Sequence, residues 1–566
     1  MLFNPKTESF GHLDDFSRSV MRKTIAFFEN KGKNKLKQHH FDRVWYDDFL
    51  EFVKENGIFA SLLTPPESAG QNADARWDTY RNCDFNEILG FYGLAYWYTW
   101  QVSILGLGPI WMSKNETVKQ QTAKMLADGG IFAFGLSEKK HGADLYNSEM
   151  ALTPLGDGRY VADGGKYYIG NANKAALVST FGKDSETDEY VFFVVEPTHE
   201  NYELVKNVVQ WQSYVAEYHL NGYPLTERDI LSRGDNAWDS ALNTVNVGKY
   251  NLGWASIGIC THAFYEAINH AGSRNLYKRY VTDFPHIRRL FVDAYSRLAA
   301  MRLFSRRACD YMRSAASTDR RYLLYNPMVK MKVTTQGEEV INLLWDVIAA
   351  KGFEKDVYFE NATADIRALP KLEGTVHVNM ALIVKFMASY FFNPDSFPVI
   401  PERKEATHDA FLFNQGPTRG LGQIRFHDYR LAYDAVDLPN IAIFKRQIEA
   451  LAHLLATSPP DKQQIKDMDF LLSLGELFTL VVYGQLLIEK CQMDAVEEDL
   501  LDQIFDFMIR DFSHYALNLH NHPSSNRVQM DQCLRMIEKP SDNAARFQRI
   551  WKNHVYILKD RYEMDP

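Results

Sequence analysis

A single carboxylate on a loop ahead of an apolar helix is the first feature of this chain that could do chemistry. Residues 367–376 read RALPKLEGTV, in which Pro370 and Gly374 mark a connection and Glu373 lies between them. Apolar residues at helical spacing follow in residues 380–387, so Glu373 is predicted to lie between two helices. A loop can direct such a carboxylate into a cleft as a general base. The same placement also suits a carboxylate that stabilises the start of the next helix, so both roles stay open.

Four stretches carry recognisable motifs. Residues 349–375 read AAKGFEKDVYFENATADIRALPKLEGT and resemble, without gaps, the C-terminal signature of the acyl-CoA dehydrogenase family, which ends in the loop YEGT. Residues 132–144 resemble its flavin loop, T-E-x-x-x-G-S-D, and residues 165–171 its strand G-x-K-x-W-I-T-N. Residues 274–277 are similar to its R-x-x-F at the end of a helix. The resemblance covers about residues 14–390 and implies an FAD enzyme that acts on an acyl-CoA thioester.

The resemblance also implies roles for individual residues. Glu373 would remove the α proton of the thioester while a hydride passes to flavin N5, which gives the trans-2-enoyl-CoA. The backbone N–H of Glu373 would hold the thioester carbonyl. The implied substrate positions are Ala143, Lys249, Leu372 and Gly374. The implied cofactor positions are Phe134, Leu136, Ser137, Tyr168, Gly170, Arg274, Tyr277, Asp346, Ala350, Thr375 and His377.

Several of these residues have simpler roles when the resemblance is set aside. Ser137 fits an ordinary turn, and Tyr168 fits a half-buried strand aromatic. Arg274 fits a solvated arginine at a helix end. Under the resemblance, its guanidinium would instead bind the FAD pyrophosphate. His377 fits a surface or structural histidine.

The chain also departs from the family pattern. Gly170 stands where the family has Thr, so one hydroxyl contact to the flavin would be missing, and Leu372 replaces a Tyr. Asp346 stands where Gln often binds the ADP half of FAD, and residues 349–352 read AAKG in place of Gly-Gly-x-Gly. FAD is still expected, with a rearranged contact to its ADP half, and the substrate stays open.

The pattern of the chain predicts a mainly α protein with a central β domain. Helical spacing fills residues 16–125 and 250–390, whereas residues 129–234 alternate as strands, with an Asp157-Gly158 hairpin turn. We predict an N-terminal helical domain over 1–128, a middle β-barrel over 129–235, a four-helix bundle over 236–392 and an extra helical domain over 393–566. The extra domain resembles that of longer family members, which implies a homodimer.

Composition narrows the class of protein. With 566 residues, 46% hydrophobic and 24% charged, the chain is long enough for several cores, and a net charge of −9 argues against nucleic acid. Five scattered cysteines without a C-x-x-C pair argue against a disulfide framework or a zinc site and favour a cytoplasmic protein. The start shows no targeting signal. The longest apolar run, residues 478–488, is shorter than the ~20 residues of a membrane span and is predicted to be a buried helix.

Two short motifs outside the resemblance are predicted to be loops without a ligand. These are the glycine-rich residues 416–422 and the imidazole pair in residues 520–522.

The leading functional hypothesis is an acyl-CoA dehydrogenase that passes electrons to an electron-transfer flavoprotein. An acyl-CoA oxidase that uses oxygen, or a catalytically silent relative that acts as a binding or assembly subunit, is the alternative. Acyl chain length, branching, pathway and the choice between CoA and another thioester carrier stay open.

Overall fold

The computed structural model describes residues 1–142 and 144–566. Its contacts divide the chain into two compact units. We call residues 9–251, 404–419 and 564–566 the sheet unit, and residues 1–8, 252–403 and 420–563 the bundle unit. Each unit is therefore built from segments that are distant in sequence.

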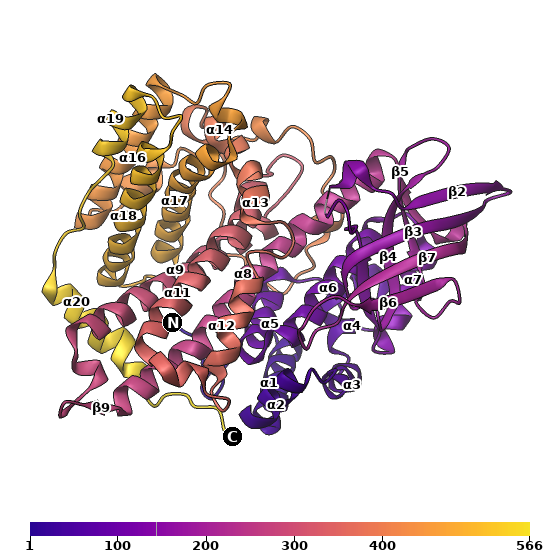
Figure 1. Cartoon of the computed structure of the whole chain (residues 1–566), viewed down its shortest axis with the longest axis horizontal. Coiled ribbons are helices and arrows are strands. Elements are labelled where there is room, and N and C mark those ends of the chain that lie inside the picture. Colours follow the sequence, from indigo (N-terminus) through magenta and orange to yellow (C-terminus); the bar gives the residue numbers. More distant parts are fainter. Residues whose placement is uncertain (143) are drawn as a thin grey trace. The chain divides into compact units, whose positions relative to one another are not determined.

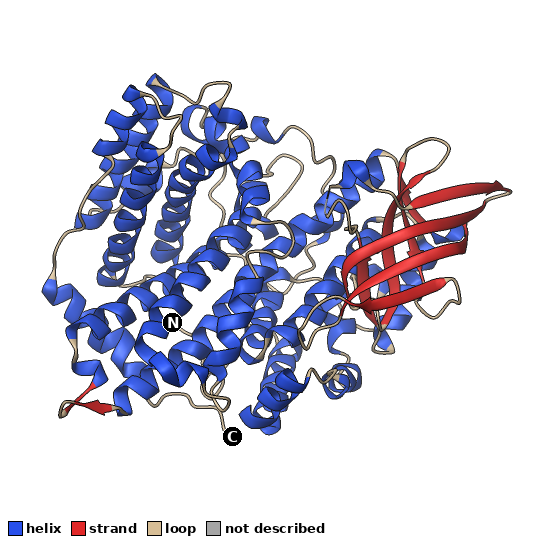
Figure 2. Cartoon of the chain, in the orientation of Figure 1, coloured by secondary structure: helices blue, strands red, loops and turns tan. Residues whose placement is uncertain are grey.

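Helices form the first part of the sheet unit (Figures 1 and 2). Asp14 begins the first of them by accepting a hydrogen bond from the backbone N–H of Ser17 at 3.0 Å, and Asp78 caps the fifth in the same way. The helices are α1 (Asp15–Lys31), α2 (Lys33–Asp42), α3 (Asp47–Glu55), α4 (Ile58–Leu63), α5 (Thr79–Tyr92), α6 (Leu94–Met112) and α7 (Glu116–Ala127). The apolar helix α6 packs closely on strand β1, because a Cβ at Gly106 would lie 2.7 Å from the backbone of Ala133.

An eight-stranded sheet follows these helices, with the order β6-β7-β3-β2-β4-β5-β8 and β1 paired in parallel with β4. The strands are β1 (Ile131–Gly135), β2 (Ala151–Gly156), β3 (Arg159–Gly170), β4 (Ala175–Asp184), β5 (Tyr190–Val195), β6 (Tyr202–Asn207), β7 (Val215–Thr226) and β8 (Ile230–Arg233). Asp157 and Gly158 both have positive φ, 54° and 70°, and join β2 to β3. The predicted hairpin turn is confirmed.

Long helices make up the bundle unit, beginning within α8 (Asp235–Ser273). The following helices are α9 (Pro285–Arg313), α10 (Tyr322–Met328), α11 (Thr334–Ile348), α12 (Tyr358–Ala368), α13 (Val376–Ile383) and α14 (Met387–Phe392). A five-residue π-helical turn, η5 (Val329–Val333), joins α10 directly to α11. The short strands β9 (Asn275–Leu276) and β10 (Arg279–Tyr280) form a hairpin after α8.

The C-terminal extension adds further helices to the same unit: α15 (Arg430–Asp434), α16 (Pro439–Thr457), α17 (Met468–Met493), α18 (Glu498–Asn521), α19 (Arg527–Arg535) and α20 (Ala544–Ile550). Within the described residues, α17 alone is long and apolar enough to cross a membrane, yet 78% of its most apolar window is buried inside the protein. It packs against α9, α13 and α18. The prediction of a buried helix over residues 478–488 is confirmed.

The segment 404–419 leaves the bundle unit and returns to the sheet unit. The Asp409 carboxylate accepts a hydrogen bond from the backbone N–H of Thr79 at 2.7 Å, and His408 accepts one from that of Trp77 at 3.1 Å. Thr418 and Arg419 bond to Asp239 and Asp235 at the start of α8. The glycine-rich loop thus has a structural use.

Candidate active site

Glu373 lies on the connection between α12 and α13 in the bundle unit, as predicted. The residue is half-buried, and its Oε2 atom is shielded from solvent. Its backbone takes a φ of 51°, in the left-handed region that few non-glycine residues adopt, and Gly374 follows with a φ of 90°. Such a conformation costs about 1–3 kcal/mol and persists only where surrounding contacts enforce it. The backbone that carries this carboxylate is therefore held in a strained conformation by its surroundings.

Contacts from two helices hold this loop. The Asn379 side chain on α13 is buried and donates hydrogen bonds to the carbonyls of Gly374, at 3.1 Å, and Thr375, at 2.9 Å. Lys330 on η5 donates to the carbonyls of Pro370, at 2.6 Å, and Gly374. Because these contacts lie on both sides of Glu373, they define the direction in which its side chain leaves the loop.

The other predicted positions of the bundle unit lie on three segments. Leu372 and Gly374 are half-buried beside Glu373, whereas Thr375, the N-cap of α13, and His377 are exposed on the same loop and helix start. Asp346 and Ala350 are exposed at the end of α11 and in the 3₁₀ turn that follows. The neighbouring Ala349 has a φ of 53° and a ψ of −135°, a conformation that suits glycine, which explains the glycine of the family signature.

Arg274 and Tyr277 lie on the hairpin that follows α8, so the predicted helix-end position of Arg274 is confirmed. Tyr277 and Lys278 form its two-residue turn with positive φ, 51° and 66°, and Tyr277 is 88% exposed. The Arg274 side chain is exposed as well. An exposed guanidinium can receive a phosphate-bearing ligand.

The predicted flavin loop of the sheet unit begins at the end of β1. Phe134 is buried in that strand, whereas Leu136 and Ser137 are half-buried just beyond it. Ser137 accepts a hydrogen bond through its carbonyl from the Tyr167 backbone N–H at 2.9 Å, and Leu136 accepts one from the Lys166 ammonium at 3.1 Å. The loop is thus joined to β3, the strand that carries Tyr168.

A buried ion pair strengthens that junction. The Lys166 ammonium lies 2.7 Å from the Glu138 carboxylate, and both side chains are almost fully buried. Glu138 also accepts hydrogen bonds from the Ser148 hydroxyl, at 2.7 Å, and from the backbone N–H groups of Glu149, at 2.7 Å, and Met150. Burial opposes the charge of Glu138, but Lys166 and these donors outweigh it and hold the pKa of the carboxyl below its ordinary value.

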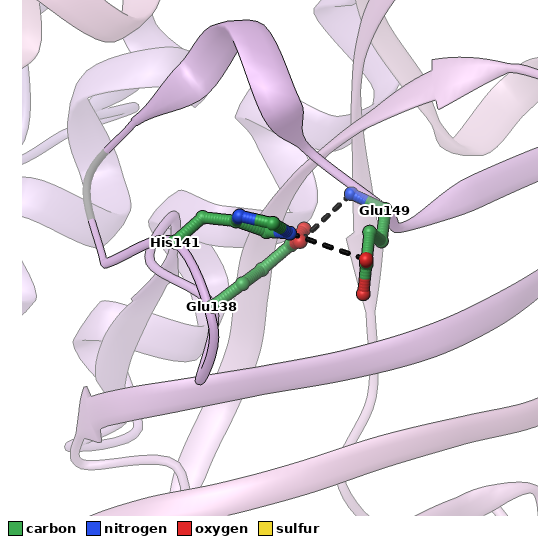
Figure 3. Close-up of side chains that lie close together, drawn as sticks. All are labelled: Glu138, His141 and Glu149. Atoms are coloured by element: carbon green, nitrogen blue, oxygen red, sulfur yellow. Dashed lines mark hydrogen bonds and ion pairs between the residues drawn. The ribbon is translucent and has the colours of Figure 1, made fainter.

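Figure 3 shows Glu138, His141 and Glu149 close together, a grouping that could in principle hold a metal ion. The Lys166 ammonium already supplies the positive charge that Glu138 requires, and it would repel a cation. His141 lies 3.2 Å from Glu149, which is exposed. We therefore interpret the cluster as a hydrogen-bond network that fixes the loop.

Tyr168 is 60% exposed although it lies within β3, because the strand bulges between Lys166 and Ile169 and Tyr168 takes a φ of 63°. An exposed aromatic ring held at a bulge suits contact with the face of a flat ring. Gly170 is buried, and a Cβ there would lie 2.7 Å from Cε1 and 2.8 Å from the hydroxyl oxygen of Tyr98. Tyr98 therefore fills the space that the family's Thr would need.

The last two predicted positions are Lys249 and Ala143. Lys249 is buried on α8 within the sheet unit. Ala143 lies outside the described residues.

These features fit FAD on observations made in each unit separately. The sheet unit offers an anchored loop with half-buried backbone groups and the exposed ring of Tyr168. The bundle unit offers the exposed guanidinium of Arg274 for a pyrophosphate and the partly shielded carboxylate of Glu373. Which of the predicted positions contact the cofactor stays a prediction.

Comparison with known proteins agrees with this interpretation. The family model "Acyl-CoA dehydrogenase, C-terminal domain" matches residues 235–388. The 3-(aryl)acrylate reductase of Clostridium sporogenes is 23% identical over 351 residues, covering 60% of this chain and 91% of the relative. Subunit CarC of the caffeyl-CoA reductase-Etf complex of Acetobacterium woodii is 22% identical over 375 residues, covering 63% and 97%. An acyl-CoA dehydrogenase of Bacillus anthracis, solved in complex with FAD, aligns over 99% of this chain and 97% of its own, with a TM-score of 0.76 and 16% identity.

These matches indicate the class of flavin-dependent oxidoreductases, and FAD is the cofactor with which the B. anthracis protein was solved. Residues 235–388 thus match the C-terminal domain of the acyl-CoA dehydrogenase family, and the whole chain, with its helical C-terminal extension, shares the fold of the B. anthracis acyl-CoA dehydrogenase. The predicted fold class is confirmed, since the B. anthracis structure matches both the helical domains with their central sheet and the extension. Acyl-CoA dehydrogenation is the general activity that these similarities support.

Sequence reasoning missed two residues of the site region. Tyr98 fills the space next to Gly170 that the family's Thr side chain would occupy, but Tyr98 lies on α6, far from Gly170 in sequence. Lys330 holds the Glu373 loop, and the available signal was that Lys330 and Lys332 alternate with apolar residues in the stretch 328–333 after Pro327.

Proposed function

We propose that the protein oxidises an acyl-CoA thioester between its α and β carbons to the trans-2-enoyl-CoA, with Glu373 as the catalytic base. The observation that carries the proposal is the placement of Glu373, which lies in a left-handed conformation with one carboxylate oxygen shielded from solvent. A shielded, positioned carboxylate is what proton removal next to a carbonyl requires.

The chain's own residues divide the work as follows. Glu373 takes the α proton, and the electron pair of that C–H bond forms the double bond as a hydride leaves the β carbon. FAD, when bound, accepts this hydride. The Glu373 backbone N–H would stabilise the negative charge that develops on the thioester oxygen, while Leu372 lines the acyl side and Gly374 leaves room for the thioester. Tyr168 and the loop at Leu136 and Ser137 would orient the cofactor.

An anaerobic titration tests this proposal. FAD-loaded protein is mixed with acyl-CoAs from short to very long, and bleaching of the flavin absorbance is followed. We expect acyl-CoAs of one length class to bleach the flavin. We expect Glu373→Gln to keep its flavin, and its rate of bleaching to be about 10²- to 10⁴-fold lower. Lys371→Met, which changes an exposed side chain on the same loop, should bleach like the wild type. Full activity in Glu373→Gln would refute the base assignment.

We also propose an electron-transfer flavoprotein as the electron acceptor. The relative CarC is a subunit of a reductase-Etf complex, which supports this choice. We expect steady turnover with a purified electron-transfer flavoprotein as acceptor. We also expect no peroxide to form during turnover in air. Peroxide formation would favour the oxidase, and colourless protein that takes up no FAD would favour the silent subunit.

The reverse direction is a second candidate, because two of the relatives named above are reductases of acrylate-type substrates. The same groups would serve, with Glu373 donating a proton to the α carbon. Reoxidation of reduced protein by enoyl-CoA and aryl-acrylyl-CoA thioesters, compared with bleaching by the saturated forms, decides between the two directions.

A homodimer is the assembly that we propose, on the basis of the helical extension and its likeness to longer members of the family. Light scattering during size-exclusion chromatography tests it. A mass of two chains is expected, and a mass of four would overturn the proposal.

A further inference from the structure

The loop that carries Glu373 is fastened by one fully buried lysine. Lys330 has no exposed surface, and its ammonium donates hydrogen bonds to the carbonyls of Pro370, at 2.6 Å, and Gly374. One carbonyl precedes Glu373 and the other follows it. The lysine therefore fixes the two ends of the short segment on which the carboxylate lies.

The lysine stands on the π-helical turn η5. Pro327, three residues earlier, has no N–H to give to the helix, and the wider π turn follows directly. The hydroxyl of Thr334 donates to the carbonyl of Lys330 at 2.5 Å, and that of Thr335 donates to the carbonyl of Met331 at 3.0 Å. These bonds satisfy carbonyls that a π turn leaves poorly paired.

The same turn is tied to the C-terminal extension. Lys332, two residues after Lys330, is almost fully buried, and its ammonium lies 3.1 Å from the carboxylate of Glu476 on α17. Burial disfavours the charge of Lys332, but Glu476 and its other acidic neighbours outweigh it and raise the pKa of this lysine above its ordinary value. The pair therefore stays charged and joins η5 to α17.

Helix α17 also supports the other side of the loop. Gly475, next to Glu476, lies so close to the Met380 sulfur on α13 that a Cβ at Gly475 would collide with it. Helix α13 begins directly after the Glu373 loop and carries Asn379, which bonds to the Gly374 carbonyl. The two residues of α17 thus contact both elements that hold the loop.

We propose that Lys330 is a positioning residue for Glu373, and that the C-terminal extension maintains this position through Glu476 and Gly475. The extension then contributes to catalysis as well as to the packing of the bundle unit. The inference rests on the proposed role of Glu373 as base. It gives the chain beyond residue 420 a role in positioning the catalytic base.

The choice of a lysine supports this proposal over a purely structural role. Burying an ammonium is costly unless its hydrogen bonds are satisfied, and an apolar side chain of similar length would fill the same space at less cost. An apolar side chain could not hydrogen-bond to the two carbonyls on either side of Glu373, whereas the ammonium bonds to both and so fixes the distance between them.

The test uses two variants and one control in the full-length, FAD-loaded protein. Lys330→Met removes the ammonium and keeps the length of the side chain, whereas Glu476→Gln removes the charge from α17. Lys490→Met is the control, because Lys490 is another buried lysine, on α17, whose ion pairs with Glu402 and Asp494 do not involve η5 or α13. Urea unfolding and flavin content are recorded for each.

The first readout is single-turnover flavin bleaching by the acyl-CoA that the titration identifies, with ordinary and α-dideuterated substrate. In Lys330→Met we expect the limiting rate to fall about 10- to 100-fold, because small displacements of a reacting group have that effect. The half-saturating concentration should stay within about twofold, and the α-deuterium isotope effect should rise. In Glu476→Gln the limiting rate of bleaching should fall about 2- to 30-fold, and in the control Lys490→Met it should stay at the wild-type value.

The second readout is amide hydrogen exchange in the peptide that spans residues 369–380, which requires no activity. Faster exchange there in Lys330→Met and Glu476→Gln, with wild-type exchange in Lys490→Met, is expected. If no thioester bleaches even the wild type, the proposed function fails and this readout alone decides the inference.

Three outcomes would overturn the proposal. A wild-type limiting rate and isotope effect in Lys330→Met would refute the positioning role, and equal losses in Lys490→Met would reduce it to general stability. Wild-type bleaching and exchange in Glu476→Gln would refute the part played by the extension. If Lys330→Met does not fold, Glu476→Gln decides, since it preserves size and shape.

Discussion

Replacing Lys166 by methionine should destabilise the flavin loop more than any exposed substitution in it. The change leaves the Glu138 carboxylate buried without its ammonium partner, and breaking a buried pair in this way costs about 3–5 kcal/mol. Three donors to Glu138 remain, from Ser148, Glu149 and Met150, so we expect a loss of about 3 kcal/mol in the free energy of unfolding. The loop would also lose its contact from Lys166 to Leu136.

Urea unfolding, followed by circular dichroism and by the fluorescence of released flavin, measures this loss. The matched control is Lys140→Met on the same loop, where the pair with Glu149 is exposed and should be worth about 0–1 kcal/mol. Combining Lys166→Met with Glu138→Leu should recover part of the loss, because the uncompensated charge is then gone. A Lys166→Met protein within about 1 kcal/mol of the wild type, or a control that loses as much, would refute the reasoning.

The same lysine predicts a pH dependence. Burial lowers the pKa of the Lys166 ammonium to about 8 from its ordinary 10.5, although Glu138 opposes this. Between these two pH values the unfolded chain binds more protons at this position than the folded chain, so the contribution of Lys166 to stability rises with pH. The difference in unfolding free energy between wild type and Lys166→Met should therefore grow from pH 8 to pH 10. A difference that shrinks over this range would contradict the assignment.

Two further substitutions test the backbone and packing of the site. Ala349→Gly should stabilise the protein by about 0.5–2 kcal/mol in urea unfolding, because glycine relieves the positive φ at this position, whereas Ala350→Gly should not stabilise it. Gly170→Thr should cost about 1–3 kcal/mol, because its Cβ would lie 2.7 Å from Tyr98 and 2.8 Å from Val102. Val102→Ala in the same chain should restore part of that loss in thermal unfolding, and a Gly170→Thr protein as stable as the wild type would show that Tyr98 moves aside freely.

Local patterns were sufficient to predict the features whose cause is local. The Asp157-Gly158 turn follows from two residues that tolerate positive φ, and the connection at Glu373 follows from Pro370, Gly374 and the apolar run after them. The fold class was predictable as well, since the change from helical to alternating spacing is a property of each segment.

Features that depend on distant packing could not be predicted in this way. Nothing near Gly170 indicates that Tyr98 fills the adjacent space, because that contact depends on how α6 packs on the sheet. Lys330 lies among the apolar residues Met328, Val329 and Met331, but its partners at Pro370 and Gly374 are 40 or more residues away in sequence. The use of the segment 404–419 by the sheet unit has no local signal at all.

That returning segment has a consequence for how the protein folds during synthesis. Asp409 bonds to the N–H of Thr79 across 330 positions of sequence, so the start of α5 lacks this partner while the intervening chain is made. At about 5–20 residues per second, the roughly 170 residues between Asn251 and Arg419 take on the order of 10–30 s to synthesise. For that time residues 9–251 can collapse but cannot complete the sheet unit, since a contact of such high sequence separation forms late. During this period the ribosome presents a nearly finished domain that still lacks residues 404–419 and 564–566, and its incomplete surface is open to chaperones.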